Sequence, residues 1–332
     1  MESPRRIGVV GATGALGAEI VRVLDRVRWR PNELVPMGRG ATVHTHVEWG
    51  EGRVPVEPAD ELDPDVELLI LAAPSDVASR LGREALREGI PVVDTSGALA
   101  RDGSAPLVVP WVNPEALMQS AGVVSLPSAA GTLVASVLGP LARAGLAGPV
   151  EATVLEPAST AGRDGIDELS DQVVALLNSR TPRRRVFPEG LAFDLGPVLG
   201  AAAEDGWTDA ELRVAQEVRA LVPGDEDPAI TLARVPLFSG ISMSLSLRPD
   251  QNVMPSLVAR VLADGGVRVA EGHGRRQVPR PRRVEGRPFA HVGRVRVSRD
   301  GDALHVWATM DNLHTMATAA VSAGAALLQR RE

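Results

Sequence analysis

The sequence predicts an α/β fold with two domains, and three observations support this prediction. The chain has 332 residues, and one domain typically takes roughly 100 to 200. Short apolar runs alternate with helical patterns through its first part, as they do in parallel sheets. Beyond Pro127 the predicted strands become longer and alternate polar with apolar residues, and we expect a second domain of α+β type there.

The composition narrows the possible chemistry. The chain contains no cysteine and no tyrosine, and its 35 lysine-plus-arginine residues are all arginine. Without thiols there is no disulfide, no thiolate metal site and no cysteine nucleophile, and without lysine no side-chain amine can form a Schiff base. The net charge of −7 argues against a nucleic-acid partner, so the arginine-rich stretches 183–185 and 275–283 are interpreted as exposed loops or interface arms.

The apolar segments are too short for a membrane protein. No segment approaches the roughly 20 apolar residues that a membrane-spanning helix needs. The apolar run near the N-terminus meets Gly11 and Gly14 before any cleavage-like site. We therefore expect no membrane partner, no secretion signal and a cytoplasmic location.

The first domain opens with a predicted strand, a glycine-rich turn and a helix. Residues 7–10 form the apolar run, and a helical pattern extends to Leu24. Between them lie the residues that we expect to contact a dinucleotide, namely Gly11, Thr13, Gly14, Ala15, Leu16 and Gly17. Glycines let the backbone approach a pyrophosphate closely, and free N–H groups at the helix start favour its negative charge. This order predicts a Rossmann-type nucleotide site.

The end of the next predicted strand, at residues 34–37, indicates which cofactor binds. In such folds an acid at this position holds a ribose hydroxyl, whereas an arginine accommodates a 2′-phosphate. Arg39 and Gly40 follow the strand here, and no acid does. Because a guanidinium binds phosphate well, we predict NADP in preference to NAD. The alternative is that Arg39 is a solvated loop residue.

The remaining elements complete the two predicted domains. In the first, strands are expected at 66–71, 91–94 and 123–126, with a helix at 75–88. In the second, strands are expected at 151–155, 230–237 and 292–297, with a helix at 207–221. An alanine-rich helix at 312–328 could return to pack on the first domain. We therefore expect one domain at 1–127 with 313–332 and another at 128–312.

Several motifs, in order along the chain, resemble the aspartate-semialdehyde dehydrogenase family. They are the glycine turn, Asp94-Thr-Ser-Gly97 with Arg101, the run from Pro106 to Glu115, Ser159-Thr-Ala-Gly162, Arg234-Val-Pro-Leu237 and Asp311-Asn-Leu313. The resemblance implies a homodimer built through the sheet of the second domain. It also implies cofactor contacts at Ser159, Thr160 and Asn312. The family reaction converts an aspartyl phosphate and NADPH reversibly to the semialdehyde, phosphate and NADP.

The residues that carry this family's chemistry are replaced. The family's nucleophile is a cysteine that forms a thioester, and Ala129 stands at that position. Its general base is a histidine seven residues past the arginine of the Arg-Val-Pro motif, where this chain has Ile241. Acyl transfer needs both an activated nucleophile and a base. The chain is thus similar to the cysteine-less, Usg-type branch, and we expect no intact catalytic residue.

The residues that anchor the family's anionic substrate survive better. The resemblance assigns a phosphate contact to Arg101 and a carboxylate contact to Arg234. It places Glu211 and Arg213 where the family has an acid and a phosphate-binding lysine. Each could equally belong to a surface ion pair. Glu156 stands at the family's active-site glutamine, where a desolvated acid could donate a proton or could pair with a nearby arginine.

Three functions remain open from the sequence. The leading hypothesis is a family member that binds NADP(H) and a small carboxylate or phosphate ligand and forms a homodimer, but lacks the thioester-forming dehydrogenase reaction. A second is an NADPH-dependent reductase without a covalent intermediate, in which Glu156 is the acid and Arg234 anchors a small carboxylated substrate. A third is a partner subunit or regulator that responds to NADP.

Overall fold

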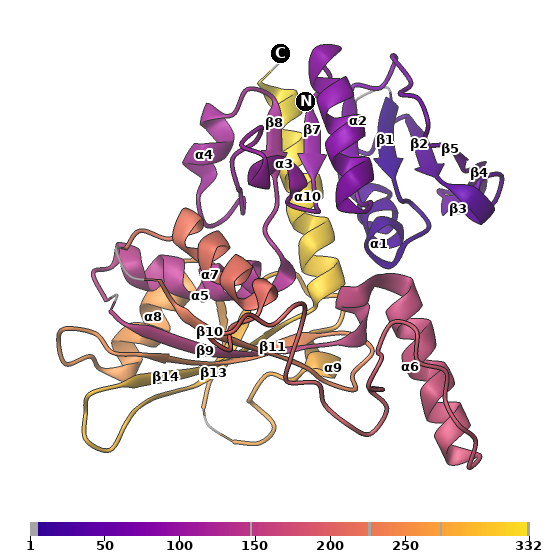
Figure 1. Ribbon diagram of the computed structural model, residues 1–332. Helices are drawn as coiled ribbons and strands as arrows, with labels where there is room; N and C mark the ends of the chain where they lie inside the picture. The colour runs from indigo at the N-terminus through magenta and orange to yellow at the C-terminus, as the bar shows by residue number, and fades with distance from the viewer. Residues whose placement is uncertain (1–5, 147, 225–226, 273, 331–332) are drawn as a thin grey trace. The chain divides into compact units, whose positions relative to one another are not determined.

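The computed structural model describes residues 6–146, 148–224, 227–272 and 274–330, which fall into two compact units (Figure 1). One unit holds the described residues of Met1–Ser128 and Met316–Glu332, and the other those of Ala129–Thr315. Helix α10 (Asn312–Gln329) begins in the second unit and continues into the first. The first unit is therefore assembled from two separate parts of the chain.

A parallel sheet forms the centre of the first unit, which confirms the predicted α/β class. Its order is β5-β2-β1-β6-β7-β8, and every pair is parallel. The strands are β1 (Arg6–Val10), β2 (Glu33–Gly38), β5 (Glu57–Pro58), β6 (Leu68–Leu71), β7 (Val92–Asp94) and β8 (Val123–Ser125). The strand order reverses beside β1, and in a doubly wound sheet ligands bind at such a reversal, outside the carboxyl ends of the strands.

Helices follow the strands of this unit. They are α1 (Ala15–Leu24), the 3-10 turn η1 (Gly40–Thr42), α2 (Ser75–Arg87), α3 (Ala98–Arg101) and α4 (Pro114–Gln119). In α2 the apolar residues Val77, Leu81 and Ala85 recur at helical spacing and are buried, so this face packs on the sheet. α10 also packs closely here, because a Cβ at Gly324 would collide with the Leu68 side chain of β6.

A mixed sheet forms the second unit, in the order β10-β9-β11-β14-β13-β12. Its strands are β9 (Val150–Glu156), β10 (Ala229–Arg234), β11 (Ile241–Leu247), β12 (Arg268–Val269), β13 (His291–Val297) and β14 (Leu304–Met310). Helices α5 (Ala129–Arg143), α7 (Asp209–Leu221) and α8 (Pro255–Asp264) pack on one face (Figure 1). The apolar residues of that face and of these helices form the core of the unit.

The opposite face of this sheet is polar. A row of register partners crosses β10, β9, β11 and β14, made of Thr231, Thr153, Ser244 and Trp307. The first three side chains are exposed and the indole of Trp307 is half-buried. Outside the sheet, η2 (Ala158–Ala161) leads into α6 (Gly162–Leu177), which extends away from the strands (Figure 1), and α9 (Pro281–Val284) precedes β13.

Some predicted boundaries are wrong. The strand expected at 230–237 ends at Arg234, because Pro236 has no N–H to donate to a ladder. The Val235 N–H still donates to the Glu156 carbonyl of β9, and the backbone then turns, with the Leu237 N–H donating to the Val235 carbonyl. The hairpin of β3 (His46–Trp49) and β4 (Gly52–Pro55) was not predicted, because its short, mostly exposed strands lack a clear apolar pattern. No helix in the described part of the chain is both long and apolar enough to cross a membrane.

Candidate functional site

The glycine turn after β1 has the geometry of a phosphate-binding turn. Gly11 has a φ of +79°, and a Cβ there would collide with the Ala72 carbonyl at the end of β6. A Cβ at Gly17 would collide with the Gly11 carbonyl, so both positions require glycine. Helix α1 begins after Gly14, and no side chain caps it. Its first-turn N–H groups are therefore placed to bind an anion.

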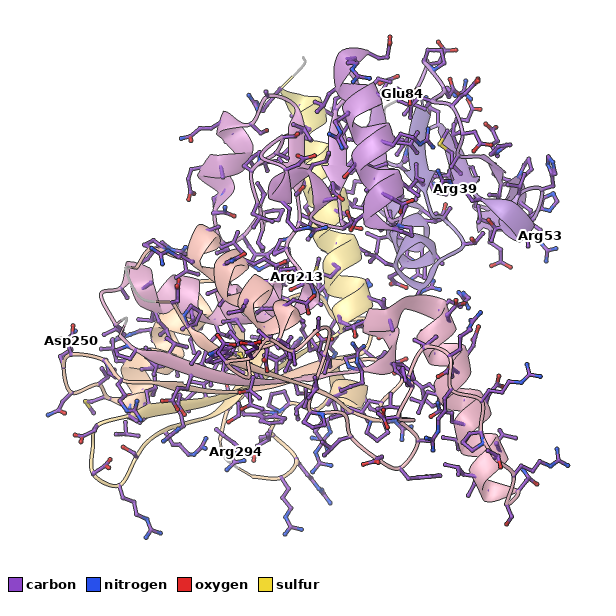
Figure 2. The ribbon with its side chains drawn as sticks, in the orientation of Figure 1. Arg39, Arg53, Glu84, Arg213, Asp250 and Arg294 are labelled. Carbon is purple, nitrogen blue, oxygen red and sulfur yellow. The ribbon has the colours of Figure 1, made fainter. Side chains whose placement is uncertain are left out.

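Arg39 lies directly beyond β2, as the sequence predicts. Its guanidinium, labelled in Figure 2, is exposed. It lies 3.8 Å from the Asp76 carboxylate at the start of α2. Such a loose, exposed ion pair is weak and leaves most of the guanidinium available. The nearby acid thus comes from α2, and the end of β2 carries none.

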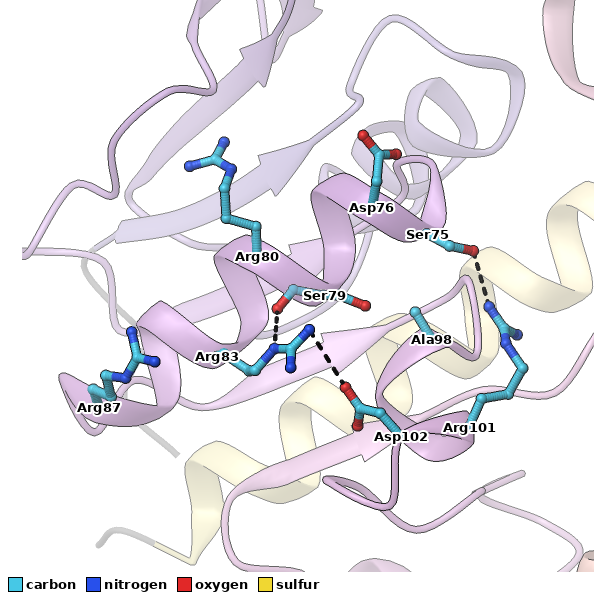
Figure 3. Close-up of a pocket in the computed structure, with 9 residues that line it drawn as sticks. All are labelled: Ser75, Asp76, Ser79, Arg80, Arg83, Arg87, Ala98, Arg101 and Asp102. Carbon is cyan, nitrogen blue, oxygen red and sulfur yellow. Dashed lines mark hydrogen bonds and ion pairs between the residues drawn. The ribbon is translucent and has the colours of Figure 1, made fainter.

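Arg101 lines an open groove of about 780 Å³ between α2 and α3 (Figure 3). The lining residues are Ser75, Asp76, Ser79, Arg80, Arg83, Arg87, Ala98, Arg101 and Asp102. The Arg101 guanidinium donates to the Ser75 hydroxyl at 2.9 Å and to the Ser96 carbonyl at 3.0 Å. Four arginines outweigh two aspartates in this groove, so its electrostatic potential favours an anion.

Both vacated catalytic positions belong to one hydrophobic core. Ala129 is the first residue of α5, and it is partly buried against the apolar cluster beneath that helix. Ile241 is the first residue of β11, is fully buried and belongs to the same cluster. Neither side chain can donate or accept a proton. At the two positions that the resemblance assigns to nucleophile and base, the structure therefore has aliphatic side chains that contact one apolar core.

Glu156 and Arg234 form an ion pair at the ends of two adjacent strands. They are register partners on β9 and β10, and Glu156 Oε2 lies 3.3 Å from Arg234 Nη2. The Thr160 hydroxyl lies 3.0 Å from the same carboxylate oxygen and accepts a hydrogen bond from Arg234. Burial lowers the pKa of the Arg234 guanidinium, and the negative charge of Glu156 opposes this effect. Of the two roles considered for Glu156, proton donor or partner of a nearby arginine, the structure shows the ion pair with Arg234.

The expected cofactor contacts of the second unit are held in local networks. Asn312 and Ser159 are buried, and the Asn312 amide donates to the Ser159 hydroxyl at 3.0 Å. The Asn312 carbonyl oxygen accepts from the Gly240 N–H at 2.8 Å. Thr160 bridges the Glu156–Arg234 pair. The structure thus brings these residues together and assigns their side chains a local role, and their cofactor contacts stay a prediction.

Glu211 and Arg213 occupy different environments on α7. Glu211 is buried, and its carboxylate accepts from the Thr208 N–H and from the Leu232 N–H, each at 3.0 Å. It therefore completes the capping box of α7 and ties that helix to β10. Arg213, labelled in Figure 2, is exposed, and its side chain forms no hydrogen bond or ion pair with another described residue. Of the two, Arg213 is the side chain that is available to a ligand.

Sequence reasoning missed the residues that hold the loop beside Arg234. Glu168 of α6 is buried and accepts from the N–H groups of Arg185, Val186 and Phe187. Burial alone would raise the pKa of Glu168, but these N–H donors lower it below its usual value. The Phe187 ring then lies 5.8 Å from the Arg234 guanidinium. Nothing in the local sequence of α6 indicates this contact, because its partners lie 17 to 19 residues away.

Among the described residues, no cluster of three or more histidine, aspartate or glutamate side chains is placed to hold a metal ion. The groups that could hold a cofactor are instead the backbone N–H groups of the glycine turn and the exposed guanidinium of Arg39. Both suit phosphate groups.

Comparison with known proteins covers both units. Residues 6–120 match the family model described as semialdehyde dehydrogenase, NAD binding domain, and residues 138–315 match semialdehyde dehydrogenase, dimerisation domain. An aspartate-semialdehyde dehydrogenase of Rickettsia bellii is 28% identical over 319 residues, covering 94% of both chains. A USG-1 protein homolog of Pseudomonas aeruginosa is 31% identical over 320 residues, again covering 94% of both.

Solved structures agree with these matches. A probable aspartate-semialdehyde dehydrogenase from Pseudomonas aeruginosa superposes with a TM-score of 0.90 at 30% identity, covering 99% of this chain and 100% of that one. Aspartate semialdehyde dehydrogenase II from Vibrio cholerae, complexed with ASA, gives a TM-score of 0.90 at 26% identity and covers 98% of both chains.

Proposed function

Because the chain belongs to the aspartate-semialdehyde dehydrogenase family, in its cysteine-less Usg-type branch, we propose that it binds nicotinamide nucleotide without the thioester-forming dehydrogenase reaction. One observation carries this proposal. Ala129 and Ile241, at the positions of nucleophile and base, are packed in the same apolar core. Loss of either member of such a pair typically removes most of the catalytic gain, and here both are lost.

The cofactor of this proposal is NADP(H). The chain carries an NAD(P)-binding domain, and the exposed Arg39 beyond β2 supports a 2′-phosphate as the distinguishing group. The backbone around Gly11 and Gly14 would hold the pyrophosphate. When bound, the nicotinamide could supply a hydride, but this chain offers no thiol on which an acyl group could accept it.

The protein acts as a homodimer in this proposal. The chain carries a dimerisation domain, and the polar face of its sheet supports a broad contact. Thr153, Thr231 and Ser244 are small and exposed, so they form a flat surface across three adjacent strands of that face. A flat face of short side chains suits close approach of a second sheet.

The alternative of a direct NADPH reductase is not supported by the site. It requires Glu156 to donate a proton and Arg234 to bind a substrate carboxylate. These two side chains instead contact each other at 3.3 Å. A binding role does not require Glu156 or Arg234 to be free. The same holds for a regulator that responds to NADP and signals to a protein partner.

Two measurements on the purified protein test the proposal. NADPH fluorescence should change on titration, which reports binding. Phosphate-dependent reduction of NADP by aspartate semialdehyde should be absent, with the Rickettsia bellii relative assayed beside it as a reference. Turnover at about 1 to 1,000 per second, the ordinary enzymatic range, would refute the proposed loss of activity. Failure of NADPH and NADP to bind at all would refute the binding function.

A further inference from the structure

We propose that the Glu156 carboxylate fills the position beside Arg234 that a ligand carboxylate would otherwise take. Glu156 thereby excludes carboxylate ligands from this site. The inference rests on the proposed function, because the family assignment makes Arg234 the group that would grip a carboxylate. It adds a residue that determines specificity, and it defines the class of ligand that the site rejects.

The fold places the two charges together before any ligand arrives. Glu156 and Arg234 are the last residues of parallel strands β9 and β10 and are register partners, so their side chains leave the sheet on the same side. Their side chains are only 11% and 17% exposed. The Coulomb attraction within a pair that is shielded from water is stronger than that within an exposed ion pair.

Neighbouring groups hold the guanidinium in this orientation. Arg234 Nη1 donates to the Pro157 carbonyl at 3.2 Å and to the Thr160 hydroxyl, while Nη2 faces Glu156. The Phe187 ring lies 5.8 Å from the guanidinium carbon. With one nitrogen engaged by backbone and hydroxyl oxygens, the Nη2 side is what remains for a carboxylate, and Glu156 already occupies it.

A carboxylate ligand would therefore have to displace Glu156. The displaced side chain would stay beside the ligand as a second, poorly solvated negative charge, because the end of β9 is buried. Two carboxylates that share one cation repel each other. A glutamine of the same size carries no charge, so it would neither hold Arg234 as tightly nor repel an anion. The acid at position 156 thus changes the class of ligand that Arg234 can accept.

The same strand offers a matched control pair. Glu151 of β9 lies 3.1 Å from Arg248, but both of these side chains are more than half exposed. Neutralising Glu151 changes the net charge of the protein by the same amount as neutralising Glu156. It leaves Arg234 and its partner in place.

The test is calorimetric titration with succinate, a dicarboxylate, in the absence of nucleotide. Glu156→Gln should bind succinate at least about tenfold more tightly than the wild type, a difference of about 1.4 kcal/mol. Glu151→Gln should match the wild type. The double variant Glu156→Gln with Arg234→Gln should lose the gain, because the guanidinium itself is then missing.

The proposal is overturned if Glu156→Gln binds succinate no better than the wild type, and this includes the case in which neither binds. It is also overturned if Glu151→Gln gains equally, or if the gain persists without Arg234. Should Glu156→Gln fail to fold, Glu156→Asp shortens the carboxylate by one methylene and should give a smaller gain of the same sign. NADPH titration of the wild type is independent of these results, so failure of the proposed function is recognised separately.

Discussion

The Ser125 hydroxyl on β8 donates a 2.8 Å hydrogen bond to Asp94 on β7, whose carboxylate is fully buried. The same carboxylate accepts from the Ser96 N–H at 2.7 Å and from the Leu99 N–H at 3.0 Å. A buried charge is tolerated when such donors satisfy it. Asp94 thus fixes the turn between β7 and α3, and with it the helix that carries Arg101.

Asp94→Asn should strongly destabilise the first unit. The amide replaces one acceptor oxygen by an NH₂ group, which then faces N–H and O–H donors in a buried space. We expect the free energy of unfolding to fall by about 2 to 4 kcal/mol in urea denaturation, against about 1 kcal/mol for Ser125→Ala. Equal effects of the two changes would show that the carboxylate is not the organising group.

Arg39→Glu should reverse the preference between nucleotides. The glutamate would repel a 2′-phosphate, so the affinity for NADPH should fall at least about tenfold while that for NADH changes little. Fluorescence titration with each nucleotide measures this. Arg53→Glu, at an exposed arginine of the β3–β4 hairpin, is the matched control (Figure 2). A similar loss with that variant would indicate a general charge effect.

Ala129→Cys should restore a thiol but no dehydrogenase turnover. Ile241 offers no proton acceptor, so no base assists the proton transfers of thioester chemistry, even though a thiol at the first position of α5 would be partly ionised. Labelling with a thiol reagent should give one modified cysteine per chain, because the natural sequence has none. Phosphate-dependent turnover by this single variant would reveal a base elsewhere and would contradict the prediction.

Ser244→Arg should dissociate the homodimer. Ser244 lies exposed in the middle of the polar sheet face, between Thr153 and Trp307 in the register. A long charged side chain there would prevent close approach of a partner sheet. Light scattering after size-exclusion chromatography should show the monomer mass. Ser256→Arg, at an exposed position of α8, should leave the mass unchanged.

His291 should make stability dependent on pH. Burial, together with the positive charges of Arg287 and Arg268, lowers the pKa of His291, and its Nε2 atom is buried with no hydrogen-bond partner. Below about pH 6.5 His291 is protonated in the unfolded chain but stays neutral in the folded protein. The free energy of unfolding is therefore highest above that pH and falls as the pH decreases. Urea denaturation at pH 8 and pH 5.5 should show a smaller loss for His291→Gln than for the wild type.

The parts of the fold that were predictable depend on local patterns. The helical spacing of Val77, Leu81 and Ala85 indicated α2, and the apolar run that ends at Leu71 indicated β6. The glycine turn was predictable because backbone packing around Gly11 and Gly17 excludes other residues. Each of these signals lies within about 20 residues of sequence.

The site itself depends on contacts between distant residues. Glu156 and Arg234 are 78 positions apart, and their pairing follows from the register of β9 with β10, which no local pattern specifies. From the sequence, an ion pair of Glu156 with an arginine was therefore one of two alternatives, the other being a proton donor. Likewise, Glu211 was assigned to a ligand from its position in a motif, whereas its N–H partners belong to a helix start and to a neighbouring strand. The ligand contacts of Arg101 and Arg213 stay predictions.

The path of α10 has a consequence for how the molecule is made. The strands of the first unit leave the ribosome early, but the helix that packs on Leu68 through Gly324 is synthesised after every residue of the second unit. Until α10 is synthesised, part of the apolar surface of the first unit's sheet stays exposed. Intermediates with exposed apolar surface are prone to aggregate. The nucleotide-binding unit therefore begins first and is completed last, so the nascent chain cannot form a finished nucleotide-binding unit before its dimerisation unit exists.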